Sequence, residues 1–135
     1  MHSEANTFSR SVSKHFDSYF KDFGLATSYV EVLIYIKKEG PALQKEIADH
    51  LNLDPSTITR FLKKLQKESW VEKEKVEGRT KIALSSKRAD EVKALQKLYR
   101  EAEDALSEIL GEKYVETTQK LLSHGNSLLE ESDKE

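Results

Sequence analysis

Three hydroxyl side chains and four cations lie between Ser56 and Lys67, with no acidic residue among them. Short hydroxyl side chains and arginine can hydrogen-bond to base edges in a DNA groove, whereas Lys and Arg neutralise phosphates. The residues with this chemistry are Ser56, Thr57, Thr59 and Arg60 for base edges, and Lys63, Lys64 and Lys67 for phosphates. The sequence therefore predicts a double-stranded DNA partner, with the hydroxyl groups and the arginine placed ahead of the lysines.

The same segment has the pattern of an amphipathic helix over about residues 55–68. Asp54 is suited to cap a helix, and Pro55 fits the first helical position, where its missing N–H costs nothing. At about 100° per residue, one face collects Ile58, Phe61, Leu62 and Leu65. The opposite face collects Ser56, Arg60, Lys63 and Lys67. One face can therefore hold the helix to a domain while the other enters a major groove.

A second, shorter helix is predicted immediately before this one, over about residues 43–50. Ile47, Ala48 and Leu51 form its apolar stripe, and Asn52-Leu53-Asp54 is typical of a three-residue turn. Two short helices joined by such a turn make the helix-turn-helix, whose second helix lies in the major groove.

A basic hairpin is predicted to follow, over about residues 70–84. Trp70-Val71 and Ile82-Ala83-Leu84 flank a charged segment that turns at Glu77-Gly78. Glycine supplies the positive φ that a tight hairpin turn needs. Arg79 and Lys81 lie just beyond this turn, so we expect both to contact DNA. The sequence thus predicts a winged helix-turn-helix in a mainly α fold with a small β-hairpin wing.

Positive charge is concentrated in this segment, although the chain carries a net charge of −2. Residues 54–88 hold 10 Lys/Arg against 5 Asp/Glu, whereas residues 89–135 hold 6 against 12. The net charge alone argues against a nucleic-acid partner, but its distribution favours one.

Helices with apolar stripes are predicted on both sides of the winged segment. Residues 1–27 hold a helix that begins near Asn6 or Thr7 and ends before Gly24. A capping box at 28–31 opens the next helix, which runs through Lys38 or Glu39. Residues 87–135 hold a long helix to about Leu110 and a last helix. The long helix carries the heptad stripe Val92, Leu95, Tyr99, Ala102, Leu106 and Ile109. We expect residues 1–27 and 87–135 to dimerise, and residues 28–86 to bind DNA.

The chain resembles the MarR (multiple antibiotic resistance regulator) family from about Phe16 onward. The resemblance is carried by Ile47-Ala48, the 56–60 run, Leu65, Glu77-Gly78-Arg79 and Leu84-Ser85. Four residues depart from the family pattern. Glu77 stands where Asp is usual, and Leu43 stands where Thr is usual. Ser69 and Arg88 each stand where Gly is usual. The resemblance implies a homodimeric regulator of transcription, more often a repressor, with two winged domains on successive major grooves. It also implies a pocket for small aromatic or phenolic effectors.

Candidate effector-binding residues are His15, Tyr19 and Tyr35, from an aromatic group that also includes Phe16, Phe20, Phe23 and Tyr29. Packing in the core or at a dimer interface is the commoner role for aromatic residues at helical spacing. A regulator that binds no effector is the alternative.

Other functions find little support in the sequence. There is no phosphate loop, nucleophile elbow or nucleophile–base pair, so we expect neither an enzyme nor a cofactor. The chain has no Cys, and its four His are far apart, so no metal site is predicted. No apolar run reaches membrane-span length and no signal peptide is evident, so a cytoplasmic protein is expected. The rival interpretation is a winged helix that binds proteins without contacting DNA, which the acidic residues Glu72, Glu74 and Glu77 favour.

Overall fold

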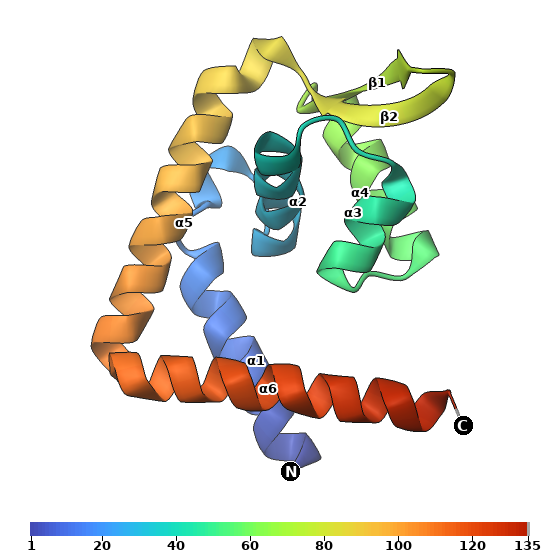
Figure 1. The fold of residues 1–135 in the computed structure, drawn as a ribbon. Helices are drawn as coiled ribbons and strands as arrows, with labels where there is room; N and C mark the ends of the chain where they lie inside the picture. Colours follow the sequence, from blue (N-terminus) through green and yellow to red (C-terminus); the bar gives the residue numbers. More distant parts are fainter. Residues whose placement is uncertain (135) are drawn as a thin grey trace. The chain divides into compact units, whose positions relative to one another are not determined.

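The computed structural model describes residues 1–134 and divides into two compact units, residues 1–99 and 100–135. Its elements in chain order are α1 (His2–Asp17), the 3₁₀ turn η1 (Lys21–Phe23), α2 (Thr27–Glu39), α3 (Gln44–Leu51), α4 (Pro55–Lys67), β1 (Val71–Val76), β2 (Arg79–Leu84), η2 (Ser86–Arg88), α5 (Ala89–Leu110) and α6 (Glu112–Asp133) (Figure 1). The predicted fold class, mainly α with a β-hairpin wing, is confirmed.

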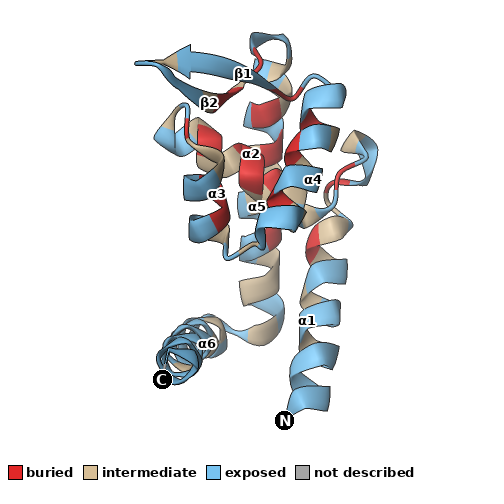
Figure 2. Ribbon diagram, turned by 90° about the vertical axis from the view of Figure 1, so that its right-hand side faces the viewer, coloured by how far each residue is buried: buried red, intermediate tan, exposed pale blue. Residues whose placement is uncertain are grey.

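The core of the first unit is built where α2, α3 and α4 face one another (Figure 2). Each helix buries one apolar stripe, and the fully or almost fully buried side chains include Val30, Leu33, Ile36, Ile47, Ile58 and Leu65. Burial of such side chains contributes roughly 1.5–3 kcal/mol each, which is what holds short helices in place. The predicted helix-turn-helix is therefore formed by α3 and α4, with Asn52 in the left-handed region at the turn.

The first helix differs from its predicted bounds. It starts at His2 and ends at Asp17 instead of running from about Asn6 to the residue before Gly24, and η1 follows. The predicted capping box at Ser28 is also wrong, because α2 starts at Thr27 and its cap is the side chain of Asp17, ten residues earlier. The carboxylate of Asp17 accepts hydrogen bonds from the Thr27 backbone N–H (2.8 Å) and the Thr27 hydroxyl (2.5 Å). Gly24, at φ +66°, supplies the left-handed end of η1, as its position before Leu25 predicts.

The hairpin has the predicted turn and a two-residue loop. β1 pairs with β2 in antiparallel register from Val71↔Leu84 to Val76↔Arg79. Glu77 and Gly78 both have positive φ, +53° and +79°, as expected for the turn that suits a twisted hairpin. Ala42 bridges Ile82 through a pair of backbone hydrogen bonds, which ties the base of the hairpin to the segment before α3.

The stripe on α5 is not one continuous exposed seam. Within the first unit, Val92 and Leu95 are completely or almost completely buried, so these two residues belong to the core of that unit. Ala102 in the same stripe is also buried, so the stripe does not offer all of its side chains to a dimer partner. Ile109, in the second unit, is exposed.

The second unit exposes most of its apolar side chains. α6 runs without a break through Gly125-Asn126, and none of its residues is buried (Figure 2). Its exposed large apolar side chains are Tyr114, Leu121, Leu122, Leu128 and Leu129. Among residues 1–134, no helix combines the length and the apolar character needed to cross a membrane.

Candidate nucleic-acid interface

The second helix of the helix-turn-helix, α4, is anchored by one face and open on the other. Ile58, Leu62 and Leu65 are buried against the core. The predicted DNA-facing side chains Ser56, Thr59, Arg60, Lys63 and Lys67 are all exposed. Pro55 occupies the first helical position and Asp54 the N-cap position, as their order in the sequence predicts. The arrangement leaves a polar and cationic face available to a partner.

The start of α4 is tied to the start of α3 through Thr59. The Thr59 hydroxyl donates a hydrogen bond to the Pro55 carbonyl oxygen (2.8 Å) and accepts one from the Gln44 side-chain amide (2.8 Å). Gln44 is half-buried at the first residue of α3. Thr57, another predicted base-contacting residue, is also half-buried. The candidate base-contacting residues thus differ in how far their polar groups remain free to bond to DNA.

Lys64 lies apart from the other cations of α4. Its ammonium group is 3.6 Å from the carboxylate of Glu68 and 5.3 Å from the centre of the Tyr29 ring. The Tyr29 ring in turn stacks on Phe61 at 4.2 Å, which joins α2 to α4. A partly exposed ion pair of this kind contributes at most about 1 kcal/mol, so Lys64 remains able to change partners.

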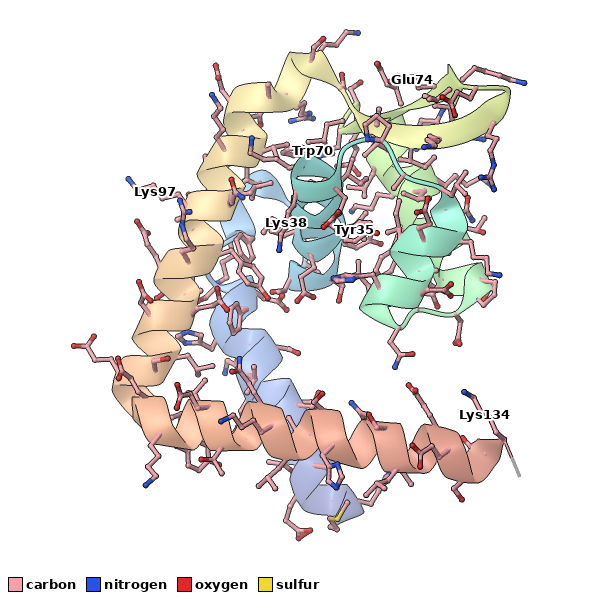
Figure 3. The ribbon with its side chains drawn as sticks, viewed as in Figure 1. Tyr35, Lys38, Trp70, Glu74, Lys97 and Lys134 are labelled. Carbon is pink, nitrogen blue, oxygen red and sulfur yellow. The ribbon has the colours of Figure 1, made fainter. Side chains whose placement is uncertain are left out.

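The wing carries cations on both of its faces. Side chains alternate across a strand, so Arg79 and Lys81 share a face with Glu74, the register partner of Lys81. Figure 3 labels Glu74 on the hairpin. Lys73 and Lys75 occupy the opposite face, together with Thr80. Arg79, Lys73 and Lys75 are exposed, and Lys81 is half-buried.

Three residues with suitable chemistry were absent from the sequence-based set: Gln44, Lys73 and Lys75. The period-two alternation of Lys73 and Lys75 with Glu72 and Glu74 could have indicated a cationic face of the hairpin. No local signal could have identified Gln44, because its partner Thr59 is 15 residues away.

The predicted aromatic group is divided among several places. Phe16 and Phe20 lie against Tyr99, at 5.2 and 6.3 Å between ring centres. Phe23 lies near Trp70, and Tyr29 lies on Phe61. The group therefore does not line one common site.

The three candidate effector-binding residues are divided in the same way. His15 and Tyr19 are together, with 5.4 Å between their ring centres. Tyr35 instead points from α2 toward α3, where its ring lies 4.6 Å from that of His50 (Figure 3). Burial, followed by the charges of Glu39 and Glu46, raises the pKa of Tyr35 above that of a free phenol.

One hollow of about 420 Å³ lies along α1 and the residues just after it. It is lined by Ser9, Arg10, Ser13, Lys14, Asp17, Ser18 and Lys21, so its walls are polar and charged. Neither His15 nor Tyr19 lines it. Within the described part of the chain, no three His, Asp or Glu side chains are grouped closely enough to hold a metal ion.

Comparison with known proteins agrees with this geometry. The family model described as "MarR family" matches residues 27–78. The uncharacterized HTH-type transcriptional regulator YwoH of Bacillus subtilis is 33% identical over 88 residues. That alignment covers 64% of this chain and 64% of YwoH, so slightly less than two thirds of the relative is matched.

Solved structures share the fold over most of the chain. A mutant MarR from E. coli complexed with operator DNA is 18% identical, with a TM-score of 0.80, over 91% of each chain. The transcriptional repressor CouR, bound to p-coumaroyl-CoA, is 18% identical, with a TM-score of 0.81, over 91% of this chain and 88% of that one. Residues 27–78 therefore match the MarR family model, and the chain shares its fold with a MarR and with CouR.

Proposed function

We propose that this chain is a sequence-specific DNA-binding regulator of transcription in the cytoplasm. The observation that carries the proposal is the orientation of α4, whose buried Ile58, Leu62 and Leu65 leave the opposite face open. Ser56, Thr57, Thr59 and Arg60 contact base edges, and Lys63, Lys64 and Lys67 contact phosphates. Arg79 and Lys81 contact the DNA from the wing, with Lys73 and Lys75 as further phosphate ligands.

We further propose that the regulator binds a pseudo-palindromic operator as a homodimer. The support is the exposed apolar surface of α6, where Leu121, Leu122, Leu128 and Leu129 are each more than half exposed. Apolar residues gathered in this way along one helix mark an interface, and a second copy of the chain is the simplest partner. Residues 1–27 and 87–135 supply this interface, and residues 28–86 bind DNA.

The proposed mode of action is repression that a small aromatic or amphipathic effector relieves. His15 and Tyr19 place two rings together, and the similar repressor CouR was solved with p-coumaroyl-CoA. An effector can act only if it binds the DNA-competent and DNA-incompetent forms with different affinity. Thermal-shift and DNA-displacement screens of phenolic acids and their thioesters test this, and no effect in either screen would favour a regulator without an effector.

Selection of bound duplexes from a random pool tests the central proposal. The expected result is one enriched, inverted-repeat sequence that the protein binds at least about a thousandfold more tightly than a scrambled duplex. The rival function, a winged helix that binds only proteins, draws support from the exposed Glu72 and Glu74 on the wing. Absence of any enriched duplex, with the protein folded, would favour that rival.

A further inference from the structure

The hydroxyl group of Thr59 is already engaged within the protein. It donates its one hydrogen to the Pro55 carbonyl oxygen and accepts a hydrogen from the Gln44 amide, at 2.8 Å in both cases. Because a hydroxyl has a single hydrogen to donate, Thr59 has none left for an acceptor on a base. A direct hydrogen bond from Thr59 to guanine O6 or N7, or to thymine O4, would require breaking the bond to Pro55.

The side chain of Thr59 is nevertheless exposed on the open face of α4. Its γ-methyl group takes no part in these hydrogen bonds and remains for a partner. In the major groove, thymine is the one base that presents a methyl group, and a threonine methyl is among the groups that contact it. We propose that Thr59 recognises thymine by contact between its γ-methyl group and the thymine 5-methyl group, an inference that rests on the proposed function.

Gln44 is a positioning residue in this arrangement. Threonine in a helix divides between two χ1 rotamers, because its hydroxyl can bond to a carbonyl of the preceding turn. The rotamer in which the hydroxyl meets both Pro55 and Gln44 makes two hydrogen bonds, and that geometry fixes the direction of the methyl group. Gln44 therefore selects which group of Thr59 faces the DNA without touching a base itself.

Replacement of thymine by deoxyuridine tests the proposal, because it removes only the 5-methyl group. The probe is the duplex selected from the random pool, with each symmetric pair of thymines replaced in turn by deoxyuridine. At one position, affinity should fall by about fourfold per half-site, the effect of removing one buried apolar carbon. Fluorescence anisotropy at constant salt measures the ratio of the two affinities.

Two variants of Thr59 separate its methyl group from its hydroxyl group. Thr59→Ser keeps the hydroxyl and removes the methyl, so it should bind thymine and deoxyuridine duplexes equally at that position. Thr59→Val keeps a methyl group and removes the hydroxyl, so it should retain the preference for thymine. Both residues can be accommodated, because position 59 is exposed.

A Gln44 variant tests the positioning role. Methionine is similar in length to glutamine but has no side-chain N–H group. Gln44→Met should therefore reduce the preference for thymine when Thr59 is present. The same substitution should leave that preference unchanged in Thr59→Val, where no hydroxyl is present to be held. A merely structural role for Gln44 would lower affinity for the two duplexes in equal proportion in both backgrounds.

Each outcome bears on the proposal. Equal affinity of the wild type for thymine and deoxyuridine at every position would overturn it while leaving the proposed function intact. A thymine preference that persists in Thr59→Ser would also overturn it and would assign the methyl contact to another residue. Failure of the random pool to yield any bound duplex would overturn the proposed function and this inference together.

Discussion

The guanidinium group of Arg88 lies 4.1 Å from the centre of the Trp70 ring and donates two hydrogen bonds, of 3.0 and 2.7 Å, to the carbonyl oxygen of Glu68. A third hydrogen bond, of 3.0 Å, joins it to the Glu91 carboxylate in the first turn of α5. Glu68 is the C-terminal cap of α4, where unpaired carbonyl groups favour a cation. Arg88 therefore links the end of the proposed DNA-binding helix to the start of α5.

We expect Arg88→Ala to destabilise the protein by about 2–3 kcal/mol, since it removes charge-assisted hydrogen bonds and a cation–π contact from a partly buried site. Chemical denaturation followed by the fluorescence of Trp70, the single tryptophan, measures the free energy of unfolding. Glu91→Gln is the matched control, because it removes only the ion pair with Arg88 and should cost at most about 1 kcal/mol. Equal losses of stability in the two variants would contradict the importance of the Glu68 and Trp70 contacts.

Ser69 adopts a backbone conformation that glycine would adopt more easily. Its φ is +63°, and the Trp70 N–H bonds to the Leu65 carbonyl oxygen at 2.8 Å, which is the Schellman pattern at a helix end. Ser69→Gly should therefore stabilise the protein by about 1 kcal/mol, the approximate cost of a non-glycine residue in this region. Ser69→Ala keeps the strain and should give no gain. Thermal unfolding of the three proteins measures the effect, and a loss of stability in Ser69→Gly would show that the strain is absent.

Local rules predicted the helix-turn-helix and the wing well, because their signals lie within a few residues of one another. Examples are Pro55 at the start of α4 and Glu77-Gly78 at the hairpin turn. The signals that failed are those that depend on distant partners. Asp17 caps α2 across ten residues, which displaced the predicted Ser28 cap. Likewise, the heptad stripe could not reveal that Leu95 is buried within the chain's own first unit.

Gln44 and Arg88 illustrate the same limit at the candidate site. Gln44 bonds to a group 15 residues away and Arg88 to one 20 residues away, so neither role follows from the local pattern. The exposed face of α4, by contrast, was predictable, because helical periodicity alone places its side chains opposite the buried ones. This face consists of Ser56, Arg60, Lys63 and Lys67.

The leucines of α6 and of α5 should respond differently to a charged substitution. Leu128→Glu changes a side chain that is 52% exposed, so the isolated chain should fold, but the proposed dimer should dissociate. Leu95→Asp places a charge at a position with 0% exposure and should unfold the first unit. Sedimentation equilibrium at micromolar concentration, with circular dichroism for folding, distinguishes the two effects. A monomeric mass for the wild type would contradict the proposed homodimer.

Arg60 and Arg79 should affect DNA binding in different ways. Arg60 lies on the exposed face of α4, so Arg60→Ala should relax sequence preference and cost roughly 1–3 kcal/mol for each base that it no longer reads. Arg79 lies at the start of β2 beside the hairpin turn, where a long side chain can reach a minor groove or a phosphate. Arg79→Ala should weaken binding and flatten the slope of log affinity against log salt, by about one unit for each phosphate that a subunit no longer neutralises.

Lys93→Ala is a suitable control for both arginines, because Lys93 is exposed on α5, outside the proposed DNA-binding residues 28–86. It removes one positive charge, so it corrects for the change in overall charge and should leave the salt slope nearly unchanged. Fluorescence anisotropy across a salt series, with the selected and a scrambled duplex, separates the two effects. Arg60→Ala should reduce the ratio of the affinities for the selected and the scrambled duplex. Arg79→Ala removes a phosphate contact, so it should weaken binding to both duplexes. If neither arginine variant differs from Lys93→Ala, the α4 face and the wing do not contact DNA, and a protein partner becomes the better interpretation.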